Sequence, residues 1–436
     1  MMMFLNNLRR RYLNPTPPPP ELKNRFLHFA LDIGWYGVLN GSVLAFISIY
    51  MTRLGGSALQ VGMINAIPAM ITLLLALPAG QWLSSRPVSK DVFISAALSR
   101  VFYLVLVLIP VIFKPGEQVA LIILTVLLMT IPGTLTNVGF TALLGEGTPP
   151  AWRGYLSGIR NSLFAITNVL TLLLSGWILD IAPFPTGYQI VFLIGFLGAA
   201  MSTLHLFFLH RTLHPKNEKQ QEKQKITVQL GYRSGLIPGA RNLGKKLASL
   251  WRLRIDILKG PFLVTLVLMF IFHLVQFIGI PIFPVYTVNS LELSDQTISL
   301  GLAAFYATVF LGSTQVARLT EKIGNQKLFG ISVCCFSLYP GLLIISSSIG
   351  MYLLTNAVGG LVWAITGGVI FNYVLEKSPQ DDLPAHTAFY MIAFNLGMLV
   401  GSLGGPWLAD LTSTLAVLAV CAVMRFLAGL SILRWG

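Results

Sequence analysis

The chain has 436 residues, of which 55% are hydrophobic and only 11% are charged, and its mean hydropathy is +0.73. A soluble globular protein is about 45–50% apolar and about 25% charged, so this composition excludes a water-soluble enzyme, a disordered chain and a collagen-like repeat. The net charge of +14 would indicate nucleic-acid binding in a soluble protein. In a chain this apolar, the positive charge instead indicates which ends of the membrane helices face the cytoplasm, and we expect no nucleic acid among its partners.

Twelve apolar stretches are long enough to cross a bilayer as helices, which takes about 20 residues each. Six of them precede a polar linker at 210–259 and six follow it. The sequence therefore predicts an all-α, polytopic membrane protein with two six-helix bundles, at 26–209 and 260–436, after an N-terminal segment at 1–25. The predicted spans are 28–50, 58–83, 92–113, 119–143, 156–180, 187–209, 260–287, 297–318, 327–348, 350–375, 386–409 and 413–434.

The basic residues predict the orientation of these helices. With the N-terminus placed inside, only Arg53 and Lys114 of the 30 Lys and Arg residues fall on the outside. Because Lys and Arg are enriched on the cytoplasmic side, both termini are expected in the cytoplasm of a protein of the cell membrane. Within the linker, 240–258 is typical of a basic amphipathic helix lying on anionic lipid of the inner leaflet, and a solvated linker is the alternative.

The two halves carry a weak internal repeat. Residues Glu146–Pro149 recur as Glu376–Pro379 and residues Trp177–Asp180 recur as Trp407–Asp410, both at an offset of 230. Only six of the 35 positions in this stretch are identical. The blocks nevertheless bracket the same element in each half, so we expect the two bundles to be pseudo-symmetric.

A polar loop follows the second helix of each half. In the second half it holds Leu319, Glu321, Lys322, Gly324 and Lys327. In the first half it holds Gly80, Arg86 and Lys90, with Ser84 and Ser85 where an acid is expected. The loop before the fifth helix holds Glu146, Pro149, Arg153 and Gly154.

These loops, with two parallel six-helix halves, resemble the major facilitator superfamily of transporters. That family reads Gly-x-Leu-x-Asp-Arg-x-Gly-Arg-Arg/Lys between helices 2 and 3, and the resemblance covers residues 26–434. It implies that charged loop residues latch the bundles together on the cytoplasmic side in the outward-facing state, with solvated loops as the alternative. The implied latch residues are Arg86, Lys90, Glu146, Arg153, Glu321, Lys322, Gly324, Lys327 and Glu376.

The resemblance also implies a substrate cavity lined mainly by helices 1, 4, 7 and 10. Polar side chains at membrane depth are costly and usually face such a cavity. The candidates on these helices, and on helices 5 and 11, are Tyr36, Asn40, Thr134, Asn137, Asn168, Gln276, Asn356, Trp363 and Asn395.

Two side chains inside predicted spans are candidates for carrying a proton. Asp32 is the only acid clearly within a span, and a carboxylate in a partly dry cavity takes up a proton more readily than one in water. The alternative places it near the cytoplasmic end, paired with Lys23, Arg25 or a helix terminus. His273 is the second candidate, because histidine titrates near neutrality, and hydrogen-bonded packing is its alternative.

Five other side chains inside predicted spans are assigned structural roles. Arg100 and Arg425 lie on helices that the resemblance places at the periphery, where bonding between helices or snorkelling is expected rather than substrate contact. Cys334, Cys335 and Cys421 have no spacing that suggests disulfides or a zinc site, and they are expected to behave as small hydrophobes.

The sequence therefore predicts a secondary active transporter that moves a small solute by alternating access, with proton coupling and facilitated diffusion both open. The alternatives are a membrane receptor or assembly factor with a transporter fold, and a facilitator or flippase for an amphiphilic solute. The lone acidic pair Asp381 and Asp382 does not suggest an enzyme, and there is no phosphate-binding Gly-x-x-x-x-Gly-Lys-Ser/Thr loop. We expect a monomer without cofactor or metal.

Overall fold

The computed structural model describes residues 19–84, 87–213, 257–379 and 382–436. Within these ranges, twelve helices are long and apolar enough to cross a membrane. The prediction of an all-α, twelve-span protein is thus confirmed. Most of the predicted amphipathic helix at 240–258 and most of the N-terminal segment at 1–25 fall outside the described residues.

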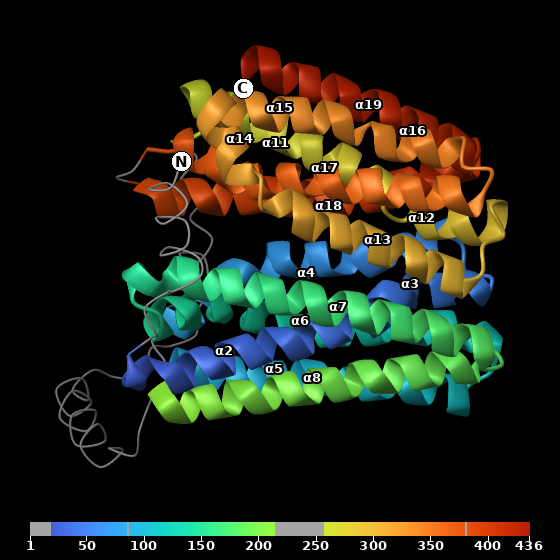
Figure 1. Cartoon of the computed structure of the whole chain (residues 1–436), viewed down its shortest axis with the longest axis horizontal. Helices are drawn as coiled ribbons and strands as arrows, with labels where there is room; N and C mark the ends of the chain where they lie inside the picture. Colours follow the sequence, from blue (N-terminus) through green and yellow to red (C-terminus); the bar gives the residue numbers. More distant parts are fainter. Residues whose placement is uncertain (1–18, 85–86, 214–256, 380–381) are drawn as a thin grey trace, which may run out of the picture.

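The first six spanning helices form one bundle (Figure 1). The first span is continuous but contains a π-helical turn: it consists of α2 (Pro20–Leu39), η2 (Asn40–Leu44) and α3 (Ala45–Arg53). The rest of the bundle consists of α4 (Ala58–Ser84), α5 (Val88–Ile112), α6 (Pro115–Gly147), the 3-10 turn η3 (Pro150–Trp152), α7 (Arg153–Ile181) and α8 (Thr186–Leu213).

The second six spanning helices form the other bundle, and two of them are interrupted (Figure 1). The seventh span is divided into α11 (Gly260–Gly279), α12 (Ile282–Val285) and the π-helical turn η5 (Tyr286–Ser290), and the ninth into α15 (Asn325–Phe336) and α16 (Leu338–Ile344). The other helices are α13 (Asp295–Ser313), the short α14 (Val316–Ile323), α17 (Ile349–Glu376), α18 (Leu383–Leu411) and α19 (Thr414–Trp435).

Two ends of the molecule are distinguished below. The terminal end holds the start of α2 and the end of α19, and the distal end holds the end of α3 and the start of α13 (Figure 1). In the second bundle, the three helices that start at the distal end are capped by serine side chains. Ser294, Ser348 and Ser413 accept a hydrogen bond from the backbone N–H three residues later, which satisfies one orphan donor of each helix.

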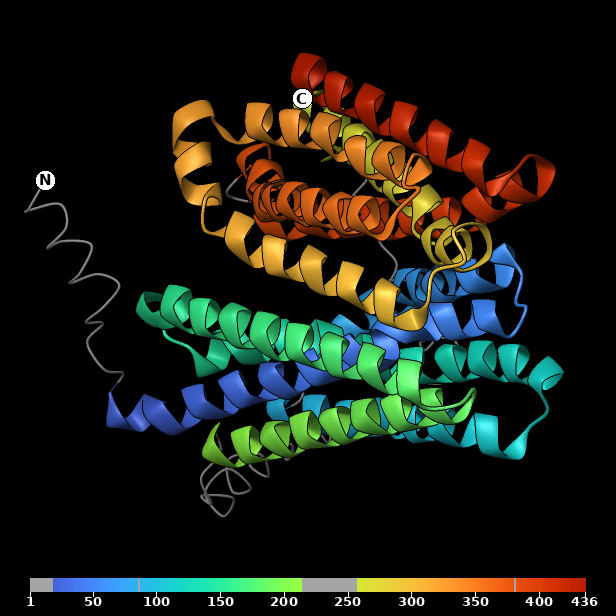
Figure 2. The same ribbon diagram turned by 45° about the vertical axis from the view of Figure 1, so that its right-hand side comes forward.

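The buried apolar side chains form three clusters whose distribution differs between the two ends. The largest lies toward the distal end and combines residues of both bundles, for example Val43 and Met51 with Ile282 and Val288. The other two are each confined to one bundle. One surrounds Phe29 in the first bundle, and the other surrounds Phe329 in the second. In Figure 2 the ribbons of the two bundles likewise approach at the distal end and diverge toward the terminal end. Among the described residues, the core that the two bundles share thus lies toward the distal end.

Candidate functional site

An ion pair joins the two bundles at the distal end. Arg53, at the end of α3, places Nη2 2.9 Å and Nε 3.1 Å from Oδ1 of Asp295, in the first turn of α13. The same Nη2 donates to the carbonyl oxygen of Leu293 at 2.5 Å, and the Tyr188 hydroxyl of α8 donates to Oδ2 of Asp295 at 2.6 Å. The two charged side chains are 27% and 13% exposed. Arg53, Tyr188, Leu293 and Asp295 are called the distal gate below.

Near the middle of the first span, Asn40 opens the π-helical turn η2. Its Nδ2 lies 3.1 Å from Oδ1 of Asn168 on α7 and 3.4 Å from the hydroxyl of Tyr306 on α13, so it contacts both bundles. Gly41 permits this approach, because a Cβ there would lie 2.6 Å from the carbonyl oxygen of Asn168. A π-helical turn inserts one extra residue and changes the direction of the side chains around it. Two predicted cavity residues, Asn40 and Asn168, therefore meet, together with a tyrosine that the sequence analysis missed.

Helices α7 and α13 pack closely between this central cluster and the distal gate. The Ser299 hydroxyl donates to the carbonyl oxygen of Leu172, and a Cβ on Gly176 would overlap the Ser299 side chain. On the other side of the interface, a Cβ on Gly62 of α4 would overlap the carbonyl oxygen of Ser402 on α18. These contacts show that the bundles are held together from the centre of the spans to the distal end.

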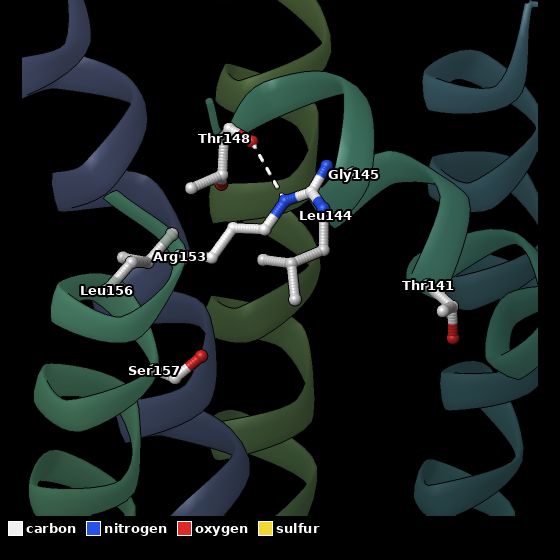
Figure 3. A pocket seen from close by; sticks show the side chains of 7 residues that line it. All are labelled: Thr141, Leu144, Gly145, Thr148, Arg153, Leu156 and Ser157. Carbon is white, nitrogen blue, oxygen red and sulfur yellow. Dashed lines mark hydrogen bonds between the residues drawn. The ribbon is translucent and has the colours of Figure 1, made fainter. Parts of the chain in front are cut away.

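A cavity of about 260 Å³ lies at the terminal end, between the end of α6 and the start of α7 (Figure 3). Nε of Arg153, a predicted latch residue, donates to the carbonyl oxygen of Thr148 at 3.4 Å, so Arg153 bonds within its own bundle. The cavity is lined by Thr141, Leu144, Gly145, Thr148, Arg153, Leu156 and Ser157.

Asp32 lies in a buried charge cluster of the first bundle and is 4% exposed. Its Oδ1 accepts a hydrogen bond from Ser202 at 2.5 Å and lies 3.9 Å from Nη2 of Arg100, and its Oδ2 lies 3.6 Å from Nη1 of Arg160. Arg100 also donates to the Thr203 hydroxyl at 3.0 Å, so it bonds between helices as expected. One carboxylate thus faces two guanidinium groups.

The cations beside Asp32 differ from those that the sequence suggested. The alternative interpretation of Asp32 paired it with Lys23, Arg25 or a helix terminus, but the structure pairs it with Arg100 and Arg160. Arg160 was missed, although it falls four residues inside the predicted span 156–180, where a basic residue is costly without a partner. Placing it beside Asp32 requires the packing of α2 against α7, which a linear sequence does not show.

His273, the second proton-carrying candidate, is a residue of α11 whose side chain packs against α18, and it is 4% exposed. Its Nε2 is 3.3 Å from the Tyr390 hydroxyl, and Gly397 permits the close packing, since a Cβ there would lie 2.9 Å from that of His273. The described contacts of His273 therefore stay within the second bundle.

The other predicted cavity residues are distributed over several environments. Thr134, Asn356 and Asn395 each donate to the backbone carbonyl four residues earlier on their own helix. Gln276 is buried and its Oε1 has no hydrogen-bond partner in the described part of the chain. Tyr36 and Trp363 are half-buried, and Asn137 is exposed.

The predicted latch residues of the second bundle do not all lie in a loop. The span predicted to end at 318 ends at Ser313, and Glu321 and Lys322 lie on the short helix α14, where both are exposed. The prediction of a plain loop there is wrong, because Gln315 and Thr314 only interrupt the helix, which resumes at Val316.

The connection after α14 is held to its own bundle. Gly324 joins α14 to α15 with φ = +80°, a conformation that favours glycine. The next residue, Asn325, donates to the Glu376 carboxylate at 2.9 Å. Lys90, Glu146 and Lys327 are exposed, and Arg86 lies outside the described residues. Within the described ranges, no three His, Cys, Asp or Glu side chains gather where they could hold a metal ion.

The whole chain resembles solved transporter structures. A D-xylose–proton symporter has a TM-score of 0.67 and 15% identity, with 95% of this chain and 97% of that chain covered. A bacterial homologue of the iron transporter ferroportin, in an inward-facing state, has a TM-score of 0.66 and 15% identity, covering 95% and 98%. The nucleoside transporter NupG has a TM-score of 0.65 and 13% identity, covering 94% and 99%. At these identities, the likeness shows a common fold.

No sequence among curated proteins matches this chain. The sequence model of the Major Facilitator Superfamily, in contrast, matches residues 26–274 and 265–436, which together span both bundles. The family model and the twelve candidate spans of the described residues indicate a multi-pass membrane transporter. The chain belongs to the Major Facilitator Superfamily.

Proposed function

We propose that this protein is a secondary transporter of the cell membrane that moves a small solute by alternating access. The observation that carries the proposal is the apolar core that both bundles share at the distal end, while each bundle has its own core toward the terminal end. With the termini in the cytoplasm, as the basic residues suggest, this arrangement is an inward-facing conformation.

The distal gate supplies the contact that must break when the transporter turns outward. Opening it separates the Arg53 guanidinium from the Asp295 carboxylate and exposes both to water. The exposed charges Glu321, Lys322 and Lys327 are then free to meet the other bundle at the terminal end, as the resemblance to the family implies. Two sets of polar contacts that form in alternate states keep the free energies of the two conformations close.

The solute site is proposed at the centre, beside Asn40, Asn168 and Tyr306. These residues lie where the shared distal core ends, so a solute bound there is reached from one side at a time. Nδ2 of Asn168 is buried and has no partner in the described part of the chain. A hydrogen-bond acceptor on the solute would satisfy it, and an unsatisfied buried donor costs about 1–3 kcal/mol.

Proton coupling is proposed through Asp32. Protonating the carboxylate would leave the buried Arg160 and the half-buried Arg100 without a counter-ion, which favours a different packing of the helices that carry them. The D-xylose–proton symporter among the structural neighbours is consistent with this proposal. Facilitated diffusion is the alternative mechanism, and a solute flux that does not respond to a proton gradient would favour it.

The test is a screen for thermal stabilisation of the purified protein, with nucleosides, di- and tripeptides, pentoses and lysolipids at two pH values. We expect one class to raise the melting temperature, and Asn40→Ala to remove the effect. A stabilising solute is then followed into proteoliposomes with and without a pH gradient. Binding without uptake would contradict the transporter proposal and favour a receptor.

A further inference from the structure

Arg425 of α19 is a buried cation with no acidic partner. The residue is 2% exposed, and none of the ion pairs in the described part of the chain includes it. Its guanidinium instead lies 4.4 Å from the ring centroid of Phe336 and 5.7 Å from that of Phe283. Burying a charged side chain without a counter-ion is costly unless hydrogen bonds replace those that it made to water.

Two hydrogen bonds of Arg425 go to backbone carbonyl groups at helix interruptions, the guanidinium also contacts the Cys421 thiol, and Nε has no partner in the described part of the chain. Nη1 lies 3.4 Å from the carbonyl oxygen of Phe336 and Nη2 lies 3.3 Å from that of Gln276. Phe336 is the last residue of α15, and the residue four positions later is Pro340, which has no N–H to donate. Arg425 therefore satisfies a carbonyl that a proline has left without its helical partner.

The second carbonyl lies in the last turn of α11. The residue four positions after Gln276 is Ile280, which follows the end of α11 at Gly279, and Pro281 comes next. The end of a helix carries free carbonyl groups and a partial negative charge, both of which favour a cation there. The guanidinium is thus bonded to the end of α11 and stacked near Phe283 of α12, on the two sides of the same interruption.

The part of the seventh span beyond this interruption closes the distal end. Helix α12 packs against α3 and α4 of the other bundle, and η5 also packs against α3. The chain then reaches Leu293 and Asp295 of the distal gate within a few residues. Because the distal gate follows on the same segment, a change at the interruption would move Leu293 and Asp295 relative to Arg53.

We propose that Arg425 is a positioning residue of the transport cycle, which holds the interruption of the seventh span so that its distal part can close on the other bundle. The inference rests on the proposed alternating access. The planar guanidinium fork bonds α11 and α15 at once, which a lysine ammonium on a flexible stem does not reproduce. Breaking this contact frees the distal part of the span while both bundles remain folded.

The experiment measures distances between spin labels at both ends of the full chain in lipid nanodiscs, by double electron–electron resonance. One pair of cysteines replaces Gly116 and Gly350 at the distal end, and the other replaces Gly154 and Ala317 at the terminal end. A Cβ on any of the three glycines meets no neighbour within 4 Å, and Ala317 is an exposed position of α14 that is not among the predicted latch residues. The background carries Cys334→Ala and Cys335→Ala and keeps the buried Cys421.

We expect Arg425→Met to lower the ratio of the population with a short distal distance (closed) to that with a long one (open) about tenfold, with a smaller shift for Arg425→Lys. Arg434→Met, the same change at an exposed position of α19, is the matched control and is expected to leave the distances unchanged. If the methionine variant does not fold, the lysine variant alone decides. Unchanged distal distances in every folded Arg425 variant would overturn the inference.

A double variant separates positioning from local stability. Adding Pro340→Ala to Arg425→Met returns an N–H to the Phe336 carbonyl, so the melting temperature should partly recover while the distal distances stay shifted. Recovery of both would show that Arg425 only satisfies α15, and would overturn the positioning role. Asp295→Asn, which breaks the gate itself, tests alternating access separately: if it moves neither label pair, the proposed function fails, whatever Arg425 does.

Discussion

Removing one charge of the distal gate should open that end of the protein. In Asp295→Asn the side chain keeps its shape and still accepts from Tyr188, but the ion pair with Arg53 is lost. An exposed pair contributes about 0–1 kcal/mol, and breaking a fully buried pair costs about 3–5 kcal/mol. Because Arg53 is 27% and Asp295 13% exposed, we expect about 2 kcal/mol, which corresponds to about a thirtyfold rise in the open population.

Hydrogen–deuterium exchange of the purified protein, read by mass spectrometry, measures this opening. Amides that exchange only from the open state should exchange up to about thirtyfold faster in peptides covering Ala45–Arg53 and Tyr286–Ser290. Peptides of α14, at the terminal end, should exchange more slowly if the two ends alternate.

The matched control is Glu292→Gln, which removes a nearby exposed carboxylate that lies outside the gate. It should leave all of these peptides unchanged. Equal exchange in Asp295→Asn and Glu292→Gln would refute the assignment of the gate. Faster exchange at both ends at once would indicate loss of stability instead of alternation.

Three further substitutions test other contacts. Asp32→Asn leaves the buried guanidinium of Arg160 and the half-buried guanidinium of Arg100 without a counter-ion, so we expect the free energy of unfolding to fall by about 3 kcal/mol, measured by thermal or denaturant unfolding; an unchanged stability would contradict the charge cluster. Gly62→Ala places a Cβ against the Ser402 carbonyl oxygen between the bundles, so the distal label pair should separate, and an unmoved pair would show that α4 and α18 need not approach so closely. Asn40→Ala loses two hydrogen bonds, one of them to Tyr306 of the other bundle, and should weaken distal closure by about 1 kcal/mol, whereas a tighter closure in distance measurements would count against the central contact.

The number and order of the helices could be predicted from the sequence because membrane spans depend on local composition. The interruption of the seventh span was not predicted. Pro281 and Pro284 explain it in the structure, but they lie within an apolar run whose composition shows no boundary. The helix α14 was missed because the predicted span runs through Thr314 and Gln315 to 318 and the charged residues Glu321 and Lys322 after it resemble a loop, whereas the helix is interrupted after Ser313 and resumes from Val316 to Ile323.

The contacts between bundles could not be predicted, because they join residues far apart in the sequence. Arg53 was noted only as a basic residue on the outer side, and its partner Asp295 is 242 residues away. Asn40 was found because a polar residue at membrane depth is costly, but Tyr306 was not, since tyrosine is common in apolar helices. Sequence patterns identify residues that need a partner, and only the fold supplies the partner.

The central claim is that the distal end must open for a solute to cross. The most direct measurement is uptake of a stabilising solute into proteoliposomes by Arg53→Cys/Asp295→Cys, cross-linked with a cleavable bis-maleimide, with Cys334 and Cys335 replaced by alanine. We predict that the cross-linked protein still binds the solute, that uptake stops, and that cleaving the linker restores it. Uptake that continues at full rate while the distal end is cross-linked would contradict the account.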